Sequence, residues 1–257
     1  MLAHPLPADA VQQLEAWRAG RGASHGSEAG THAVHYAPAS WTGIQPWPGQ
    51  LADRTQPGLT ALSRDLVREV AQADSTSGEW MDTLVASYVW GQGRNGYGPH
   101  RLHTILQRTS LRTVLSRAVA ELTVNGAVAA YRVMRGAIGG LGPAFFTKFL
   151  YFAGAGLPQV PGSRPLILDR CIARVLRAHA MRAGQEAGFE QPARLAAWLW
   201  SNGGWSAHRY GIYLQWLHCA TGSLVHAASC SAAPDLLELA LFYGGWDPAA
   251  AGSTALP

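Results

Sequence analysis

Helical spacing of apolar residues is the feature that most restricts how this chain can fold. Apolar side chains recur three and four positions apart in many segments, and hardly any stretch alternates apolar with polar residues. The sequence predicts an all-α fold of about ten helices, with at most a little extended structure before residue 60. The expected helices cover residues 7–18, 60–73, 80–90, 101–108, 111–125, 128–138, 144–153, 169–183, 192–201, 207–221 and 234–243.

Composition shifts along the chain indicate three regions. Residues 1–59 are rich in Pro, Trp and Gly without a clear period, so we expect an N-terminal extension with an irregular segment. Residues 60–246 carry the helical pattern and form the expected main domain, and residues 247–257 form a flexible tail. A chain of 257 residues with 48% hydrophobic residues can bury a large core, as one domain or as two lobes.

Charge and cysteine content exclude several classes of protein. Only 14% of the residues are charged, which argues against a disordered chain, and a net charge of +4 is compatible with a polyanionic partner. Cys171, Cys219 and Cys230 are widely spaced, so they form no zinc or iron–sulfur motif. The ten histidines have no ligand spacing either. We expect no metal, no cofactor, no signal peptide, no membrane association and a cytoplasmic location.

Lys148 is the single lysine among twenty lysine and arginine residues. Arginine serves most surface functions of a cation, but only lysine offers an amine that can lose its proton and attack carbon. Residues 145–152 around it are almost wholly apolar, and such a setting disfavours the charged ammonium. The alternative is a lysine that survived by chance and extends its amine to water.

A glycine-rich turn separates two of the expected helices shortly before Lys148. Residues 139–143 read Gly-Gly-Leu-Gly-Pro. Glycines let backbone amides approach a ligand closely, and a helix N-terminus favours a phosphate. Gly140 and Gly142 are therefore candidate phosphate contacts, although the same pattern also occurs in ordinary turns.

The order of hairpin, lysine and aspartate resembles the helix–hairpin–helix DNA glycosylase superfamily. Within it, the chain is most similar to 8-oxoguanine DNA glycosylases and their bacterial OGG-fold relatives. The resembling residues are 88–93, 96–98, 146–152, 167–169, 205–210, 213–214 and 238–242. The resemblance implies an all-α glycosylase fold in two lobes, with the hairpin near residues 138–144.

The resemblance also implies a chemistry for two residues. The lysine of such enzymes attacks the sugar C1′, a Schiff base forms, and β-elimination can nick the strand, while an aspartate orients the amine and stabilises positive charge on the sugar. These roles fall to Lys148 and Asp169; a plain helix N-cap is the alternative for Asp169. The common pattern has its lysine two residues after the last hairpin glycine, where this chain has Ala144. Lys148 lies one helical turn later and shares that helix face.

The resemblance further assigns base recognition and DNA contacts. Glu238 corresponds to a glutamine that reads the guanine edge, and Phe242 corresponds to a phenylalanine that stacks on the base. The alternatives are a solvated helix face for Glu238 and helix core for Phe242. Trp90 and Gln92 correspond to pocket positions, unless they belong to a structural turn. The expected DNA contacts are Gly140, Gly142, Asn95, His208 and Arg209.

The resemblance thus implies a DNA glycosylase, with accompanying lyase activity, that removes 8-oxoguanine or another modified purine. Its expected partner is double-stranded DNA with a damaged or modified base, and we expect a monomer associated with the nucleoid. Three alternatives remain open at this point: a catalytically inactive DNA-binding protein of the same fold, a monofunctional glycosylase in which Asp169 activates water, and a glycosylase for another modified base in foreign DNA.

Overall fold

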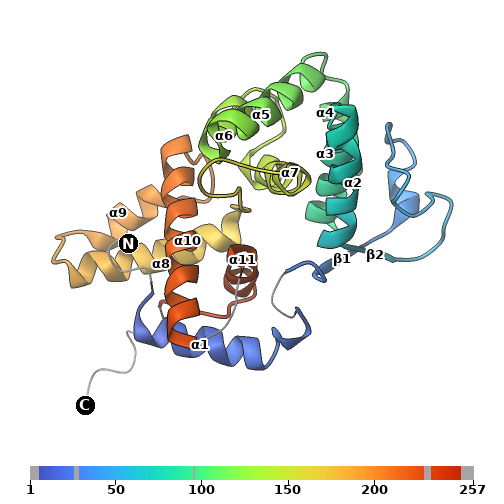
Figure 1. Cartoon of the computed structure of the whole chain (residues 1–257). Coiled ribbons are helices and arrows are strands. Elements are labelled where there is room, and N and C mark those ends of the chain that lie inside the picture. The colour runs from blue at the N-terminus through green and yellow to red at the C-terminus, as the bar shows by residue number, and fades with distance from the viewer. Residues whose placement is uncertain (1–5, 26–28, 95, 229–232, 250–257) are drawn as a thin grey trace. The chain divides into compact units, whose positions relative to one another are not determined.

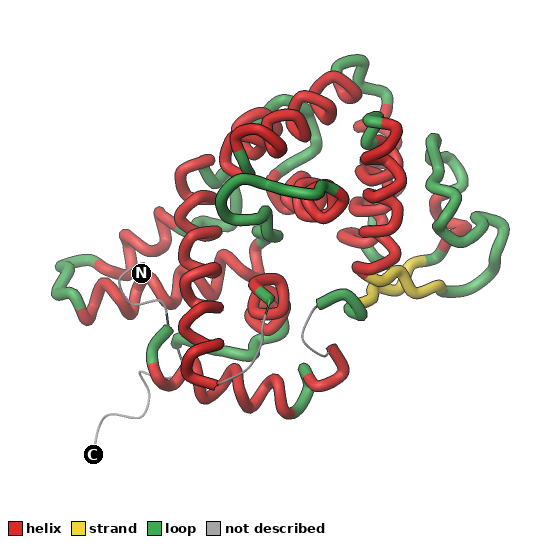
Figure 2. Tube along the Cα trace, viewed as in Figure 1, coloured by secondary structure: helices red, strands yellow, loops and turns green. Residues whose placement is uncertain are grey.

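The computed structural model describes residues 6–25, 29–94, 96–228 and 233–249. Helices make up most of this part of the chain, and its only strands form one two-stranded sheet (Figures 1 and 2). The expected all-α fold is therefore confirmed. The chain divides into two compact units, one formed by residues 30–167 and one by residues 1–29 with 168–257. The region boundaries expected at residues 59 and 246 stay predictions.

The unit of residues 30–167 is built around one apolar helix. Its elements are β1 (Ala33–Tyr36), η2 (Pro38–Trp41), β2 (Thr60–Ser63), α2 (Arg64–Ser77), α3 (Met81–Gln92), α4 (Gly98–Leu106), α5 (Leu111–Asn125), α6 (Ala127–Met134) and α7 (Pro143–Gly156). Helix α7 packs against both α2 and α3, while α5 pairs with α6. Phe146, Phe149 and Phe152 on α7 are fully buried, which explains why this segment is apolar on all sides.

The small sheet corrects the expected start of the second helix. Residues 60–63 form β2, which pairs antiparallel with β1 so that Ala33 lies opposite Ser63. Helix α2 begins only at Arg64, because the Ser63 hydroxyl accepts a hydrogen bond from the Leu66 amide (3.1 Å) and caps the helix. Leu62 fits the apolar spacing of the helix, but it belongs to β2, and its side chain is buried there.

Asp74 joins α2 to the start of α3. Its Oδ2 accepts hydrogen bonds from the Thr83 amide (2.7 Å) and the Thr83 hydroxyl (2.8 Å), and both side chains are buried. The N-cap residue of α3, Trp80, provides no side-chain hydrogen bond. A carboxylate from the neighbouring helix therefore satisfies the amide that a local cap would otherwise bind.

We expect Asp74→Ala to lower the free energy of unfolding by about 2–3 kcal/mol, because it leaves a buried amide and hydroxyl without their acceptor. Urea unfolding followed by circular dichroism measures this loss. The control is Glu69→Ala, which removes an exposed carboxylate from the same helix. A loss below about 0.5 kcal/mol for Asp74→Ala, the usual range of surface substitutions, would contradict the proposed capping role.

The second unit combines the first helix of the chain with its last four. It contains α1 (Ala8–Ala19), η1 (Ala23–His25), α8 (Arg170–Glu186), α9 (Pro192–Leu199), α10 (Ala207–Ala228) and α11 (Pro234–Phe242). Helix α1 packs against α10 and α11. The Arg182 guanidinium on α8 lies 2.9 Å from the Asp9 carboxylate on α1 and also donates to Glu186 (3.0 Å). Among the described residues, no helix has the length and apolar character that crossing a membrane requires.

Candidate functional site

A glycine-rich turn connects α6 to α7. Helix α6 ends at Met134, four residues before the expected end, and a turn of residues 135–142 follows. Gly140 has a φ of 89°, a backbone conformation that side chains disfavour. Leu141 is buried and anchors the turn, while Gly140 and Gly142 are exposed. The two glycines predicted to contact phosphate therefore lie at the surface.

The turn leads directly into the N-terminus of α7. Gly142 is the N-cap residue and Pro143 the first helical residue, which suits a ring that fixes φ and lacks an N–H. The amides of Phe145 and Phe146 donate to the Gly142 carbonyl oxygen (2.9 and 3.0 Å), and the dipole of α7 places a partial positive charge at this end. A Cβ at Gly139 would lie 3.8 Å from the Arg108 guanidinium, so a cation from the loop that follows α4 lies beside the turn. The start of α7 and the Arg108 guanidinium together form a positive surface that can bind an anion.

Lys148 extends its amine back along α7. The Nζ donates a hydrogen bond to the Ala144 carbonyl oxygen (2.7 Å), one turn earlier, and the side chain is only 8% exposed. The Nζ also lies 5.7 Å from the centroid of the Phe145 ring, a cation–π distance. Side chains of a helix tilt toward its N-terminus. The amine therefore reaches the level of Ala144, one turn before its own backbone position.

The Phe145 ring near the Lys148 amine belongs to an aromatic stack. The Tyr88 ring on α3 stacks on Phe145, with ring centroids 4.2 Å apart and an interplanar angle of 16°. Burial raises the pKa of Tyr88, and the positive charge of Arg101 offsets part of that rise, so the phenol stays neutral. The ring beside the amine, Phe145, is thus supported by an uncharged phenol.

Trp90 lies in a packed cluster near the end of α3. Its ring makes edge contacts with His32 (5.3 Å) and Phe152 (5.5 Å), and the Arg64 guanidinium lies 5.1 Å from its centroid. The side chain is 5% exposed, and its Nε1 has no hydrogen-bond partner among the described residues. The burial agrees with a core residue, and the expected role of Trp90 in base recognition stays a prediction.

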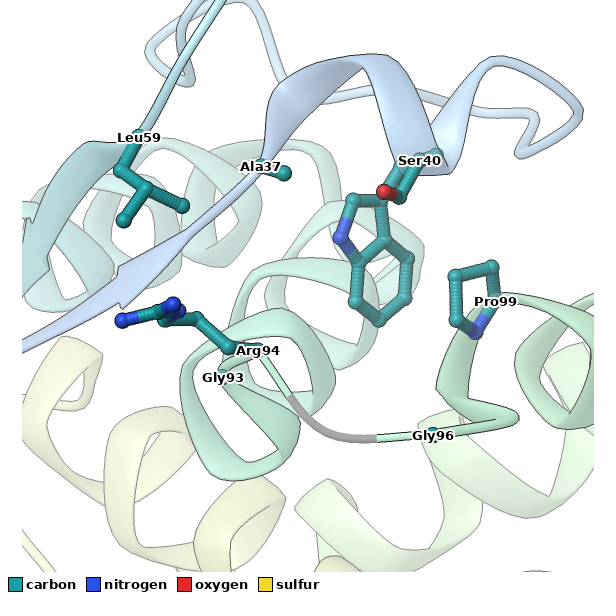
Figure 3. A pocket seen from close by; sticks show the side chains of 8 residues that line it. Ala37, Ser40, Leu59, Gly93, Arg94, Gly96 and Pro99 are labelled. Atoms are coloured by element: carbon teal, nitrogen blue, oxygen red, sulfur yellow. The ribbon is translucent and has the colours of Figure 1, made fainter.

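Gln92 is the last residue of α3. Its side chain packs over Gly98, where an added Cβ would lie 2.2 Å from the glutamine Cγ. Asn95, another predicted contact, lies outside the described residues. A neighbouring pocket is lined by Ala37, Ser40, Trp41, Leu59, Gly93, Arg94, Gly96 and Pro99. Figure 3 shows the Arg94 and Leu59 side chains on one side of it, with Ser40 and Pro99 on the other.

Asp169 caps helix α8 in the second unit. Its Oδ1 accepts hydrogen bonds from the amides of Cys171 (2.8 Å) and Ile172 (3.1 Å). The N-cap interpretation is thereby confirmed, and it fixes the orientation of the carboxylate. An anchored carboxylate is also able to stabilise a nearby positive charge, so the cap does not conflict with a catalytic role.

The two residues assigned to base recognition lie on α11. Glu238 is only 2% exposed, so it does not belong to a solvated helix face. Phe242 ends the helix and is 38% exposed, and its ring meets Tyr243 edge-on with centroids 5.3 Å apart. One buried carboxylate and one exposed ring are therefore four residues apart on the same helix.

His208 and Arg209 belong to the first turn of α10. His208 is exposed, and the Arg209 guanidinium lies 4.5 Å above the ring of Trp198, which is 65% exposed. The cap of this turn comes from Ser206, whose hydroxyl accepts from the Arg209 amide (3.2 Å). An arginine on an exposed indole is a surface feature suited to phosphate or base contact, and both residues stay predicted DNA contacts.

Sequence reasoning missed the contact between α3 and the lysine. The sequence predicts that the helix breaks at Gly91, but α3 continues through Gln92, and a Cβ at Gly91 would lie 2.5 Å from Lys148 Cδ. A glycine inside a helix was the available signal, because glycine is disfavoured there unless another group approaches the backbone.

In the described part of the chain, no group of three or more His, Cys, Asp or Glu side chains is placed to bind a metal ion. Comparison with protein families gives a match over most of the chain. Residues 27–242 match the family described as "Putative 8-oxoguanine DNA glycosylase OGG-like protein". Comparisons with curated proteins and with solved structures give no match.

Proposed function

Because the chain belongs to this OGG-like family of DNA glycosylases, we propose that it excises a modified purine from double-stranded DNA. The leading substrate is 8-oxoguanine, and the Lys148 amine is the nucleophile. Strand nicking by β-elimination follows from the same intermediate.

One observation carries the assignment of the nucleophile. The Lys148 amine lies 2.7 Å from the Ala144 carbonyl oxygen, at the beginning of α7 and beside the exposed glycine turn. The long side chain extends one turn back, so the amine lies nearer to the start of α7 than the backbone of Lys148 does. The only lysine of the chain is thus available at the helix end that faces a phosphate in the helix–hairpin–helix arrangement.

The proposed reaction uses the amine first as a nucleophile. The neutral amine attacks C1′ of the sugar, the bond between C1′ and the base nitrogen breaks, and the base leaves with that electron pair and takes up a proton. The attached nitrogen gives up one proton, the C1′–O4′ bond breaks with its electron pair on O4′, and O4′ takes up a proton, which leaves a protonated Schiff base. Loss of a C2′ proton then expels the 3′ phosphate. The base must first leave the helical stack to expose C1′.

Asp169 is the proposed electrostatic partner. Positive charge develops on the sugar as the base departs, and a carboxylate of fixed orientation lowers the free energy of that state. The two amides that bind its Oδ1 provide this orientation. Its cooperation with Lys148 rests on the resemblance, and the substitutions argued in the Discussion test it.

Glu238 and Phe242 are the proposed residues for base recognition. A carboxylate accepts two hydrogen bonds and so complements the N1–H and N2–H donors of a guanine-like base. Phe242 offers a partly exposed ring for stacking. The low exposure of Glu238 supports this role, because a hydrogen bond to a carboxylate is stronger where water is excluded.

We expect Gly140→Ala to weaken binding to undamaged duplex DNA about tenfold, because a side chain at a φ of 89° strains the turn that presents its amides to phosphate. Fluorescence anisotropy at several salt concentrations measures the affinity. Gly139→Ala is the matched control, since that glycine has no positive φ and its Cβ would meet the nearest atom at 3.8 Å. Equal affinities for the two variants would count against phosphate binding by the turn.

Borohydride trapping tests the function as a whole. The protein is mixed with duplexes that carry a single candidate lesion or a single abasic site, and sodium borohydride reduces any Schiff base to a stable adduct. The proposal requires a covalent complex and release of the base. Base release without an adduct would favour a monofunctional glycosylase, and DNA binding without base release from any lesion would favour an inactive binding protein.

A further inference from the structure

Gly91 leaves open the space that the Lys148 side chain occupies. An added Cβ at this position would lie 2.5 Å from Lys148 Cδ and 2.9 Å from Cε, both far closer than real Cβ contacts. The next nearest atom is Cε1 of Phe145 at 3.6 Å, which is ordinary contact. An added Cβ would therefore clash only with the lysine side chain, at the last two carbons before its amine.

From this packing we infer that Gly91 is a positioning residue, which holds the Lys148 amine in place by letting its stem lie against the bare backbone of α3. This role rests on the proposed function of Lys148 as the nucleophile. It adds a constraint from a different helix, since Gly91 touches the stem of the lysine but none of the reacting atoms.

Three contacts together fix the amine. On the α3 side, the lysine stem lies against the backbone of Gly91. The Nζ donates to the Ala144 carbonyl oxygen and lies 5.7 Å from the centroid of the Phe145 ring. Phe145 is itself held by its stack on Tyr88, three residues before Gly91 on α3. Helix α3 thus contributes two things: Tyr88 supports the Phe145 ring, and Gly91 leaves space for the lysine stem.

Substitution of Gly91 is expected to affect chemistry much more than folding. The stem is the flexible end of a long side chain, so it can yield to a methyl group, and alanine also favours the helix more than glycine does. The Lys148 amine then moves away from the Ala144 carbonyl oxygen and the Phe145 ring. Since a displacement of about 1 Å can cost about 100-fold in rate, we expect Gly91→Ala to slow Schiff-base formation by about that factor.

The experiment compares Gly91→Ala with Gly49→Ala, a substitution that meets no atom within 4 Å. Borohydride trapping on a duplex with one abasic site gives the rate of Schiff-base formation, and anisotropy on the same duplex gives the affinity. We expect the Gly91 variant to keep its melting temperature and its affinity within about twofold while trapping becomes about 100-fold slower. An unchanged trapping rate would overturn the inference.

The single lysine provides a second readout that does not need activity. An amine-reactive ester labels Lys148 as the only side-chain amine, and peptide mass spectrometry follows the rate. Displacement of the amine in Gly91→Ala is expected to speed labelling relative to wild type and Gly49→Ala, and equal rates would overturn the inference. If wild-type protein forms no trapped complex at all, the proposed function fails, while the labelling rates still decide whether Gly91 positions the lysine.

Discussion

Lys148→Gln is expected to abolish the trapped complex and to slow base release at least 1000-fold. Removal of a covalent nucleophile typically costs several orders of magnitude in rate. The effect should be unusually clear in this protein because the chain has no second lysine to replace Lys148. Gel analysis of borohydride-treated reactions measures the adduct, and single-turnover kinetics on an 8-oxoguanine duplex measure base release.

Glutamine is the informative substitution at this position. Its amide can still donate a hydrogen bond, as the amine does to the Ala144 carbonyl oxygen, but it cannot attack carbon. The melting temperature and the affinity for DNA should therefore stay near the wild-type values. A trapped complex of normal yield in Lys148→Gln would assign the nucleophile to another amine and refute the mechanism. Normal base release without an adduct would support the monofunctional alternative.

Asp169→Asn is expected to slow base release about 100-fold while the fold stays intact. Asparagine caps a helix about as well as aspartate, so the hydrogen bonds from the Cys171 and Ile172 amides can persist. Only the negative charge is lost, and with it the stabilisation of positive charge on the sugar. Loss of a single electrostatic stabiliser typically costs between 100-fold and 1000-fold.

Asp169→Ala separates capping from chemistry. Alanine removes both the charge and the cap, so we expect an additional loss of about 1 kcal/mol in the free energy of unfolding. Chemical denaturation compares the stability of the two variants, and single-turnover kinetics compare their rates. If the asparagine variant keeps the wild-type rate and only the alanine variant is impaired, Asp169 acts through the helix cap and not through its charge.

Local sequence patterns predicted the helices well where caps and apolar spacing agree. Helix α5 covers residues 111–125 as expected, because Asn125 and Gly126 end the apolar repeat in the sequence as they do in the structure. The strand of residues 60–63 was missed, since Leu62 satisfies the helical spacing and only its pairing with Val34 reveals the strand. Long-range pairing of this kind leaves no local signal.

The candidate site was predictable in its parts but not in its packing. A single lysine in an apolar segment was visible from the sequence, as was the aspartate at a helix start. The return of the amine to Ala144 was not visible, because it depends on the direction of a side chain within α7. The fit against Gly91 depends on the approach of two helices, and the burial of Glu238 depends on the partners of α11.

The path of the chain between its two units has a consequence for synthesis on the ribosome. Residues 30–167 are continuous, so this unit can fold as soon as it has emerged. Helix α1 emerges earlier, but its partners α10 and α11 follow more than 180 residues later. At typical rates of translation the delay is on the order of 10–40 s. During that time the apolar face with Leu14 and Trp17 lacks its partners. Helix α1 is thus made long before it can dock, and slow assembly or chaperone dependence should trace to this helix.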